Sequence, residues 1–130
     1  MALKVELVSP ERILFSGEAR TVIARTAGGD IAFMTGHAPF VGALGIGIVR
    51  ILPEAGAGEE VAAVHGGFVE VKDDRVTILS DVAELASQID VERARRAQDE
   101  AQRRAAAGDD AEAEAAVRRA SVRLQAAGAA

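Results

Sequence analysis

The stretch FVEVKDDRVTIL, residues 68–79, decides the fold of the first two thirds of the chain. Aliphatic and β-branched residues fill both of its halves, as is typical of short strands. Asp73 and Asp74 stand between the halves, and aspartate is one of the residues that a tight turn accepts. The stretch therefore predicts a β-hairpin with strands over residues 68–72 and 75–79.

Similar runs recur about every ten residues through the first part of the chain, separated by glycine, proline or acidic residues. At the amino end Leu3, Val5 and Leu7 alternate with charged residues, which predicts a strand with one buried face. The other expected strands cover residues 21–26, 31–34, 46–52 and 61–65. So many short antiparallel strands predict an antiparallel β-sandwich or flattened barrel.

The last third of the chain predicts two helices. It has no proline and consists mainly of Ala, Arg, Asp, Glu and Gln, most of which are strong helix formers. Asp90 is the expected N-cap of the first helix, which Gly108 ends. The second helix is expected to be capped by Asp109 or Asp110 and to end before Gly128.

We therefore expect two parts, a β-sandwich over residues 1–88 and an α-helical hairpin over residues 89–130. Helical spacing gives each helix an inward stripe made mostly of alanine. The expected stripes are Ile89 or Ala94, Ala97, Ala101 and Ala105 in the first helix, and Ala113, Val117, Ala120 and Leu124 in the second. Alanine buries little apolar area, so this hairpin should be held weakly. Composition leaves open whether it stays docked on the sandwich or extends along a partner.

Composition also excludes several classes of protein. The 130 residues include no cysteine and two histidines, which excludes disulfides, thiolate metal sites and most histidine-built metal sites. No run approaches the roughly 20 apolar residues that cross a bilayer. The net charge of −5 disfavours binding to nucleic acid. We expect a cytosolic chain without a targeting segment, a metal or a required cofactor.

The stretch GDIAFMTGHAPFVGALGIG, residues 29–47, is dense in glycine. A catalytic interpretation would make His37 a general base next to Asp30, but the stretch offers no nucleophile and lacks the spacing of a phosphate-binding loop. A protein-contact surface fits the apolar, glycine-shaped stretch better. The second histidine, His65 in VHGGF, is expected to be a hydrogen-bonded residue at the end of a strand, beside a bulge or tight bend.

Several motifs, in order, resemble the epsilon subunit of bacterial F-type ATP synthases. GDIAFMTGHAP is similar to that family's G-E-x-G-I-x-P-G-H-A-P, with Asp30 for Glu, Ala32 for Gly and Thr35 for Pro. HGGFVEV is similar to S-G-G-F-x-E-V, so His65 stands where the family pattern has Ser. VTILSDVAE and IDVERA follow in order, and the resemblance covers essentially the whole chain.

The resemblance implies a non-catalytic rotor component that couples proton flow to ATP synthesis on other subunits. Its sandwich would bind the gamma subunit and rest on the c-ring, with Asp30, His37 and Phe40 as contact residues. Asp30 would offer a carboxylate to basic c-ring residues, although simple folding of the loop accounts for His37 equally well. The chain would lie peripherally at the cytoplasmic face of the plasma membrane, held there only through the complex.

The resemblance further implies a regulatory hairpin. In many bacterial members it extends toward the alpha and beta subunits and inhibits ATP hydrolysis, and in some it folds around one ATP. The positions that match the ATP-binding forms are Glu84, Ile89, Asp90, Arg93, Ala94, Arg119 and Arg123. Glu100 stands where those forms have another arginine. The alternative is that these arginines form a solvated face with neighbouring ion pairs.

A different class of protein also fits the residues, namely a free-standing adaptor that senses a nucleotide through the hairpin. The two interpretations differ in one observable. A rotor component requires a stable complex with gamma, whereas an adaptor can exist as a free monomer.

Overall fold

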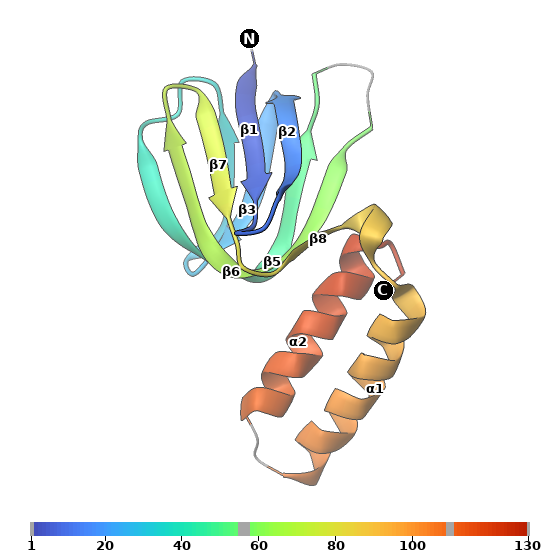
Figure 1. Ribbon diagram of the computed structural model, residues 1–130. Helices are drawn as coiled ribbons and strands as arrows, with labels where there is room; N and C mark the ends of the chain where they lie inside the picture. The colour runs from blue at the N-terminus through green and yellow to red at the C-terminus, as the bar shows by residue number, and fades with distance from the viewer. Residues whose placement is uncertain (1, 55–57, 109–110, 130) are drawn as a thin grey trace.

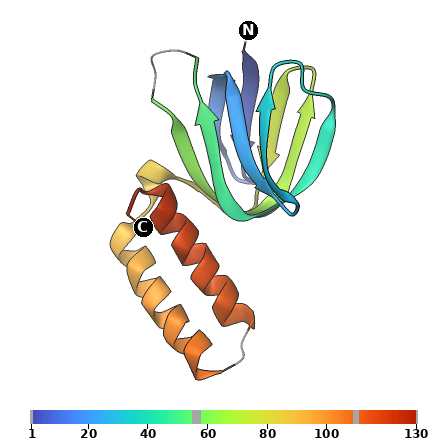
Figure 2. The same cartoon turned by 180° about the vertical axis from the view of Figure 1, so that it is seen from behind.

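A computed structural model describes residues 2–54, 58–108 and 111–129 of the chain. The strands form one lobe and the two helices form a second lobe at one end of it (Figure 1). The same arrangement is seen from behind in Figure 2. This confirms the predicted fold class, a β-sandwich followed by a helical hairpin.

In the described part of the chain, the first lobe contains eight strands and the second contains two α-helices. The strands are β1 (Leu3–Val8), β2 (Ile13–Ala19), β3 (Thr21–Thr26), β4 (Gly29–Met34), β5 (Phe40–Leu52), β6 (Glu60–Lys72), β7 (Arg75–Leu79) and β8 (Ala83–Leu85). A short 3₁₀ helix, η1 (Ala86–Gln88), leads to α1 (Val91–Ala107) and α2 (Ala111–Ala126). The strands follow the order β2-β1-β7-β6-β5-β3-β4, and β8 pairs with β6.

Strands β3 and β7 have the bounds that the sequence predicts, but four other points of the prediction need correction. The runs expected at 61–65 and 68–72 are the two ends of one long strand, β6. Strand β5 begins at Phe40, well before the expected residue 46, and β2 was not predicted at all. The sheet is also not wholly antiparallel, because β1 pairs with β7 in parallel.

The predicted β-hairpin over residues 68–79 is confirmed. Val71 pairs with Val76, and Lys72 pairs with Arg75, so the loop consists of Asp73 and Asp74 alone. Both aspartates have left-handed backbone conformations, with φ of 51° and 58°. Two successive left-handed residues are the geometry that fits a two-residue turn to the twist of its strands.

Two glycines bend β6 between the part that pairs with β8 and the part that pairs with β7. Gly66 and Gly67 have φ of 88° and 113°, where other residues are strained. A Cβ on Gly67 would lie 2.0 Å from the carbonyl oxygen of Leu79. The backbone of β7 therefore approaches β6 at a point that only glycine allows.

The core lies inside the first lobe. Its members are aliphatic side chains on the inward faces of the strands, together with one buried aromatic ring, Phe33. The largest fully buried side chains are Phe33, Leu3, Leu7, Ile78, Val5, Val22, Val49, Val64, Val69, Val71 and Val76. Close packing of these branched side chains is what makes the sandwich rigid.

The second lobe is capped as predicted at both of its described ends. The Asp90 side chain accepts a hydrogen bond from the backbone N–H of Arg93, 3.0 Å away, as an N-cap does. After α2 the chain closes through hydrogen bonds from Gly128 to Gln125 and from Ala129 to Leu124. The expected caps Asp109 and Asp110 lie outside the described residues.

The seam between α1 and α2 is made mostly of alanine. Its buried residues are Ala94, Ala101, Ala113, Ala120, Leu124 and Ala126. Ala97 is exposed, contrary to prediction, and its place in the stripe is taken by Gln98, whose amide donates to Ser121 Oγ at 3.0 Å. The prediction is off by one residue because an inward stripe alternates steps of three and four residues.

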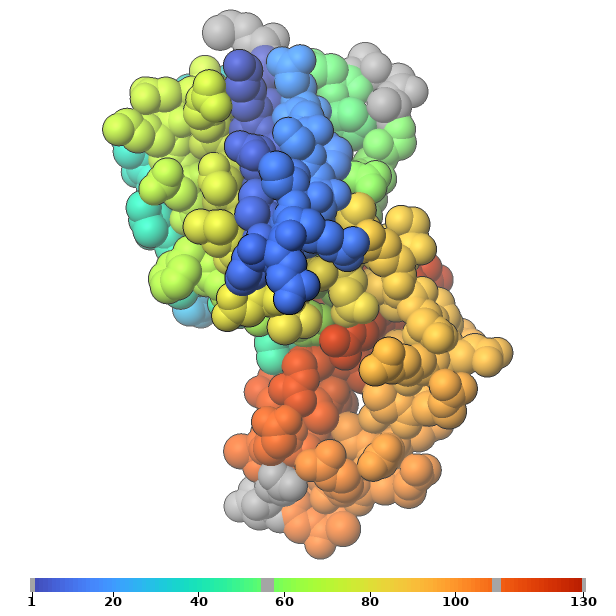
Figure 3. Space-filling view, in the orientation of Figure 1, coloured from blue at the N-terminus to red at the C-terminus, as the bar shows by residue number. Residues whose placement is uncertain are grey.

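The hairpin is docked in this structure. Helix α2 contacts β5 and β6, while α1 lies on its far side (Figures 1 and 2). The space-filling view shows the helical lobe extending well beyond the sandwich (Figure 3). Among the described residues, the lobes meet mainly where α2 lies against β5 and β6 and where β8 and η1 lead into α1.

Candidate functional site in the helical hairpin and on the sandwich

A groove of about 310 Å³ lies where β8 and η1 meet the two helices. Its lining combines two arginines, two carboxylates, an amide and two alanines. These residues are Glu84, Gln88, Asp90, Arg93, Ala94, Ala97 and Arg123. Five of the seven residues that the resemblance assigns to ATP thus line one groove, although they come from three separate segments of the chain.

Glu84 and Arg123 form the central ion pair of this groove. Arg123 Nε donates to Glu84 Oε1 at 2.5 Å, and both side chains are about 30% exposed. The pair links β8 directly to α2. It therefore closes the sandwich onto the helical lobe.

The other assigned residues have distinct positions. Asp90 is held by its N-cap bond to the Arg93 backbone, while the Arg93 side chain is exposed at the groove. Arg119 lies outside the lining and donates to Glu112 at 2.6 Å. Ile89 is half-buried between η1 and α1 and does not line the groove either.

Two lining residues were not predicted. Gln88 belongs to η1, and its amide oxygen accepts a hydrogen bond from the backbone of Leu85, 3.2 Å away. Ala97 lies one turn beyond Ala94 on the same side of α1. Helical spacing from Arg93 and Ala94 was the available signal for Ala97. No motif or spacing in the sequence indicated that Gln88 would line the groove.

His65 lies behind the ion pair, and the expectation that it is hydrogen-bonded is wrong. Its side chain is 3% exposed, and among the described residues neither ring nitrogen has a hydrogen-bond partner. Nε2 lies 3.8 Å from Glu84 Oε1, beyond hydrogen-bonding distance. The pKa of His65 is lowered to about 4, chiefly by burial; the positive charges of Arg123 and Arg119 add to the decrease, and Glu84 opposes it.

Asp30 and His37 do not form a catalytic pair. Asp30 Oδ1 accepts from Arg25 Nε at 2.7 Å, at the start of β4. His37 lies beyond the other end of β4, where Nδ1 is 2.7 Å from the carbonyl oxygen of Ala38. The imidazole packs edge-on against Phe33 and Phe40, with ring centroids 5.0 and 6.3 Å away.

The sequence suggested that Asp30, His37 and Phe40 share one loop surface, but the structure places them at two different ends of the sandwich. Asp30 borders a groove with Val117 and Arg118 of α2, so it lies at the end of the sandwich nearest the helices. His37 and Phe40 lie at the opposite end, where the backbone N–H of Gly36 donates to Asp74 at 2.7 Å. A small partner surface can therefore contact either Asp30 or the pair His37 and Phe40, but not all three at once.

An apolar stripe crosses the outer face of the sandwich. Cross-strand pairing aligns Ile13 with Val8, Val8 with Leu79, Leu79 with Phe68, and Phe68 with Ala43. Because paired residues project to the same face, the five side chains form one row across five strands. Ile13 is 58% exposed, Leu79 50% and Phe68 59%.

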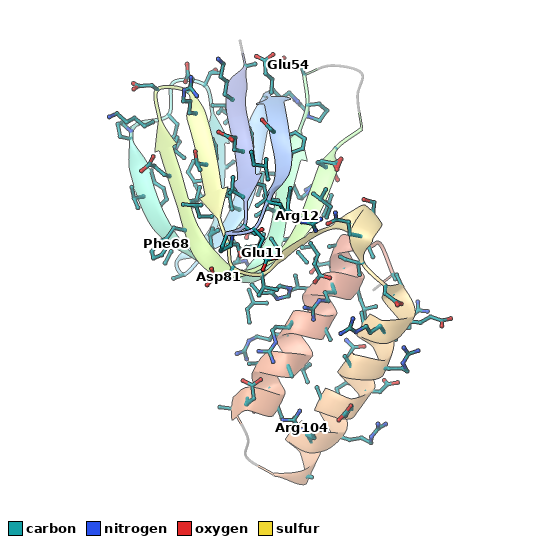
Figure 4. The ribbon with its side chains drawn as sticks, in the orientation of Figure 1. Glu11, Arg12, Glu54, Phe68, Asp81 and Arg104 are labelled. Atoms are coloured by element: carbon teal, nitrogen blue, oxygen red, sulfur yellow. The ribbon has the colours of Figure 1, made fainter. Side chains whose placement is uncertain are left out.

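The stripe lies toward the end of the sandwich that faces the helices. Figure 4 places Phe68 there, together with the exposed acidic residues Glu11 and Asp81 of the neighbouring turns, and Glu54 at the opposite end. Contiguous apolar patches on the surface of a domain are candidates for protein contact.

Neither described helix combines the length and the hydropathy needed to span a membrane. Within the described residues there is also no cluster of three or more metal-binding side chains.

Comparison with known proteins identifies the family. The model of the family described as ATP synthase, Delta/Epsilon chain, beta-sandwich domain matches residues 2–86. This match ends in η1, just before the helical lobe. The chain belongs to the ATP synthase delta/epsilon family.

Relatives of this ATP synthase chain match over nearly its whole length. The ATP synthase epsilon chain of Streptomyces griseus is 51% identical over 124 residues, which cover 95% of this chain and 94% of the relative. That of Thermobifida fusca is 52% identical over 127 residues, covering 96% and 91%. The chain is therefore an epsilon-type chain, as the sequence motifs suggested.

Solved structures show the same fold. A chain in the cryo-EM structure of the Euglena gracilis mitochondrial ATP synthase, OSCP/F1/c-ring, matches with a TM-score of 0.73 at 23% identity. The match covers 98% of this chain and 78% of that one. A chain of the Tetrahymena thermophila mitochondrial ATP synthase central stalk and c-ring matches with a TM-score of 0.55 at 17% identity.

Proposed function

We propose that this epsilon-type chain is a non-catalytic component of the central stalk of a bacterial ATP synthase, where it couples proton-driven rotation to ATP synthesis on other subunits. The observation that carries the proposal is the near-complete match to epsilon chains.

The gamma subunit is the partner that we assign to the apolar stripe. Phe68 and Leu79 lie side by side on neighbouring strands and are each at least half exposed. Covering a large apolar side chain contributes about 1.5–3 kcal/mol. A row of such residues would thus supply much of the free energy of a stable complex.

The c-ring is the partner that we assign to the helix-proximal end of the sandwich. Three exposed carboxylates lie at this end, namely Asp30 at the start of β4, where it pairs with Arg25, and Glu11 and Asp81 between strands. Carboxylates complement basic c-ring loops, and electrostatic complementarity fixes how two surfaces align. His37 and Phe40 order the opposite loop by packing on Phe33.

The gamma assignment is tested by co-purification with purified gamma. Phe68→Ser should weaken the complex at least tenfold, because it removes a large apolar side chain from the middle of the stripe. Met34→Ser is the matched control, since Met34 is 55% exposed on β4, outside the stripe. Equal binding by the Phe68 variant and the parent would contradict the assignment. A chain that remains a free monomer beside gamma would favour the adaptor alternative.

ATP is the ligand that we assign to the groove in the hairpin, as a regulator rather than a required cofactor. Arg93 and Arg123 offer two guanidinium groups, while Asp90 and Glu84 offer acceptors for the nucleoside. A phosphate would have to draw Arg123 away from Glu84. Arg119 lies one turn away on α2 and could join once it leaves its partly exposed pair with Glu112, which is a weak interaction.

Calorimetric titration of the full-length chain with ATP tests this assignment. We expect saturable heat that is lost in Arg123→Ala and retained in Arg118→Ala, which removes a neighbouring exposed arginine outside the groove. Absence of heat from the parent chain at millimolar ATP would remove ATP as a ligand.

The hairpin is also proposed to act as a brake on ATP hydrolysis when it extends toward the alpha and beta subunits. Within the described part of the hairpin the buried side chains are alanines and Leu124, so such a movement exposes little apolar area and costs little free energy. Deleting residues 89–130 should raise hydrolysis by the assembled enzyme. Unchanged hydrolysis would show that the hairpin is not a brake in this enzyme.

In the assembled enzyme, the chain would lie at the cytoplasmic face of the bacterial plasma membrane and would be held there through gamma and the c-ring.

A further inference from the structure

His65 occupies the joint between the two lobes. It lies on β6 immediately before the glycine bend, and its backbone N–H donates to the carbonyl oxygen of Val82 at 3.0 Å. This bond fixes the segment before β8 against β6. The imidazole is consequently held beneath Glu84, the residue that receives Arg123 from α2.

Charged groups reach the imidazole from two elements. Glu84 of β8 lies 3.8 Å from Nε2, and its carboxylate is already paired with Arg123. Arg123 and Arg119 of α2 place two positive charges near the ring. On its own strand and on β5 its neighbours are glycine and apolar residues, including Ile46 as its cross-strand partner.

A neutral imidazole suits this environment and a charged one does not. The ring is almost wholly buried, and among the described residues no acceptor lies within hydrogen-bonding distance of either nitrogen. A buried charge without a hydrogen bond is costly. The two arginines add repulsion, and Glu84 Oε1 already receives Arg123 and lies beyond hydrogen-bonding distance of Nε2.

We propose that His65 makes docking of the helical hairpin sensitive to protons: protonation of His65 opposes the Glu84–Arg123 ion pair and favours release of α2 from the sandwich. Undocking removes both arginines from the neighbourhood of the ring and admits water. The undocked form therefore accommodates the imidazolium, and Glu84, left without Arg123, becomes its partner. This proposal concerns docking alone and holds whether or not the groove binds ATP.

The direction of the effect follows from linkage. In the docked form the pKa of His65 is lowered to about 4, chiefly by burial, and on release it returns toward the ordinary value of 6.5. Between these values the undocked form binds more protons, so acidification favours it. Above pH 6.5 docking is at full strength. Lowering the pH from 7.5 to 5.5 should raise the ratio of undocked to docked molecules about tenfold.

Single-molecule fluorescence on the full-length chain measures this ratio. The chain has no cysteine, so Glu70→Cys on β6 and Arg103→Cys on α1 provide two unique sites for dyes. Both positions are exposed and lie in different lobes. The expected result is an undocked fraction that increases on acidification from pH 7.5 to 5.5, by the factor given above.

Variants of the two histidines separate the proposal from a general effect of acid. In His65→Phe, which keeps a ring but cannot titrate, the ratio should be independent of pH in this range. In His37→Gln, which removes the other histidine far from the joint, the pH dependence should persist. A parent chain whose ratio does not change, or an equal change in the His65 variant, would overturn the proposal.

An NMR titration of the unaltered chain keeps the test independent of how the His65 variant folds. Only two histidine signals are present, and His37→Gln assigns them. The proposal requires His65 to titrate well below 6.5 in molecules that remain docked. A His65 signal that titrates near 6.5 without undocking would contradict it.

Discussion

The sandwich and the hairpin are stabilised by different kinds of side chain. The sandwich buries Phe33 and a set of branched aliphatic residues, most of them no more than 2% exposed. The hairpin buries five alanines and one leucine. At about 25 cal/mol per Å² of apolar area, the first set gives each strand far more stability than the second gives each helix. The comparison indicates a closely packed sandwich and a more weakly held helical lobe.

The largest difference between the two lobes is expected when the largest buried side chain of each is truncated. Phe33→Ala should destabilise the sandwich by about 3–5 kcal/mol, because it leaves a cavity in a close-packed core. Leu124→Ala should release the hairpin at a cost of about 2 kcal/mol and leave the sandwich folded. Urea unfolding followed separately in the two lobes measures both effects. Loss of both lobes in the Leu124 variant would show that they fold as one unit.

Glycines provide a second contrast. Gly67→Ala should destabilise the sandwich by about 3 kcal/mol, since the added Cβ meets the Leu79 carbonyl and φ is 113°. Gly108→Ala, at the end of α1, has nothing within 4 Å and an extended φ of −176°. Its effect should stay within about 0.5 kcal/mol. The free energy of unfolding of each variant decides the point, and similar values would contradict the described bend.

The smallest expected effect lies at the start of the hairpin. Asp90→Ala removes the N-cap bond to Arg93 and should destabilise α1 by about 1 kcal/mol. Asp99→Ala, an exposed aspartate on the same helix, is the control and should change little. Helix content during thermal unfolding reports both. An equal effect of the two substitutions would mean that the cap is not what holds the first turn.

Local patterns predicted those elements whose faces differ in polarity. The runs at β3 and β7 lie between clear turn residues, and their bounds were found from the sequence. Strand β2 was missed because Ser16, Gly17 and Glu18 interrupt its apolar residues. It forms through pairing with β1, a contact that no local pattern reveals.

The glycine-rich start of β5 shows a different limit. Composition favours a loop there, but the glycines belong to a strand and make room for neighbouring side chains. A Cβ on Gly42 would lie 2.7 Å from the Phe40 ring, and one on Gly47 would lie 2.5 Å from Arg25 Cβ. The need for that space comes from packing, so the sequence alone does not disclose it.

The candidate groove was predictable only through motifs. The pattern around Asp90 and Arg93, together with Glu84 and Arg123, named most of the lining before the structure placed these residues in one groove. Arg119 departs from the prediction because Glu112, two turns earlier on α2, receives it instead. The expectation that His65 is hydrogen-bonded was wrong because β8 and α2 surround its ring, and the residues of its own strand do not reveal these neighbours.

Hydrogen exchange of the full-length chain, resolved by mass spectrometry, tests most directly the claim that a rigid lobe carries a lightly held one. Amides of α1 and α2 should exchange about 100-fold faster or more than those of β3, β6 and β7, through an opening that leaves the sandwich folded. Exchange of both lobes at one common rate, limited by global unfolding, would contradict the claim.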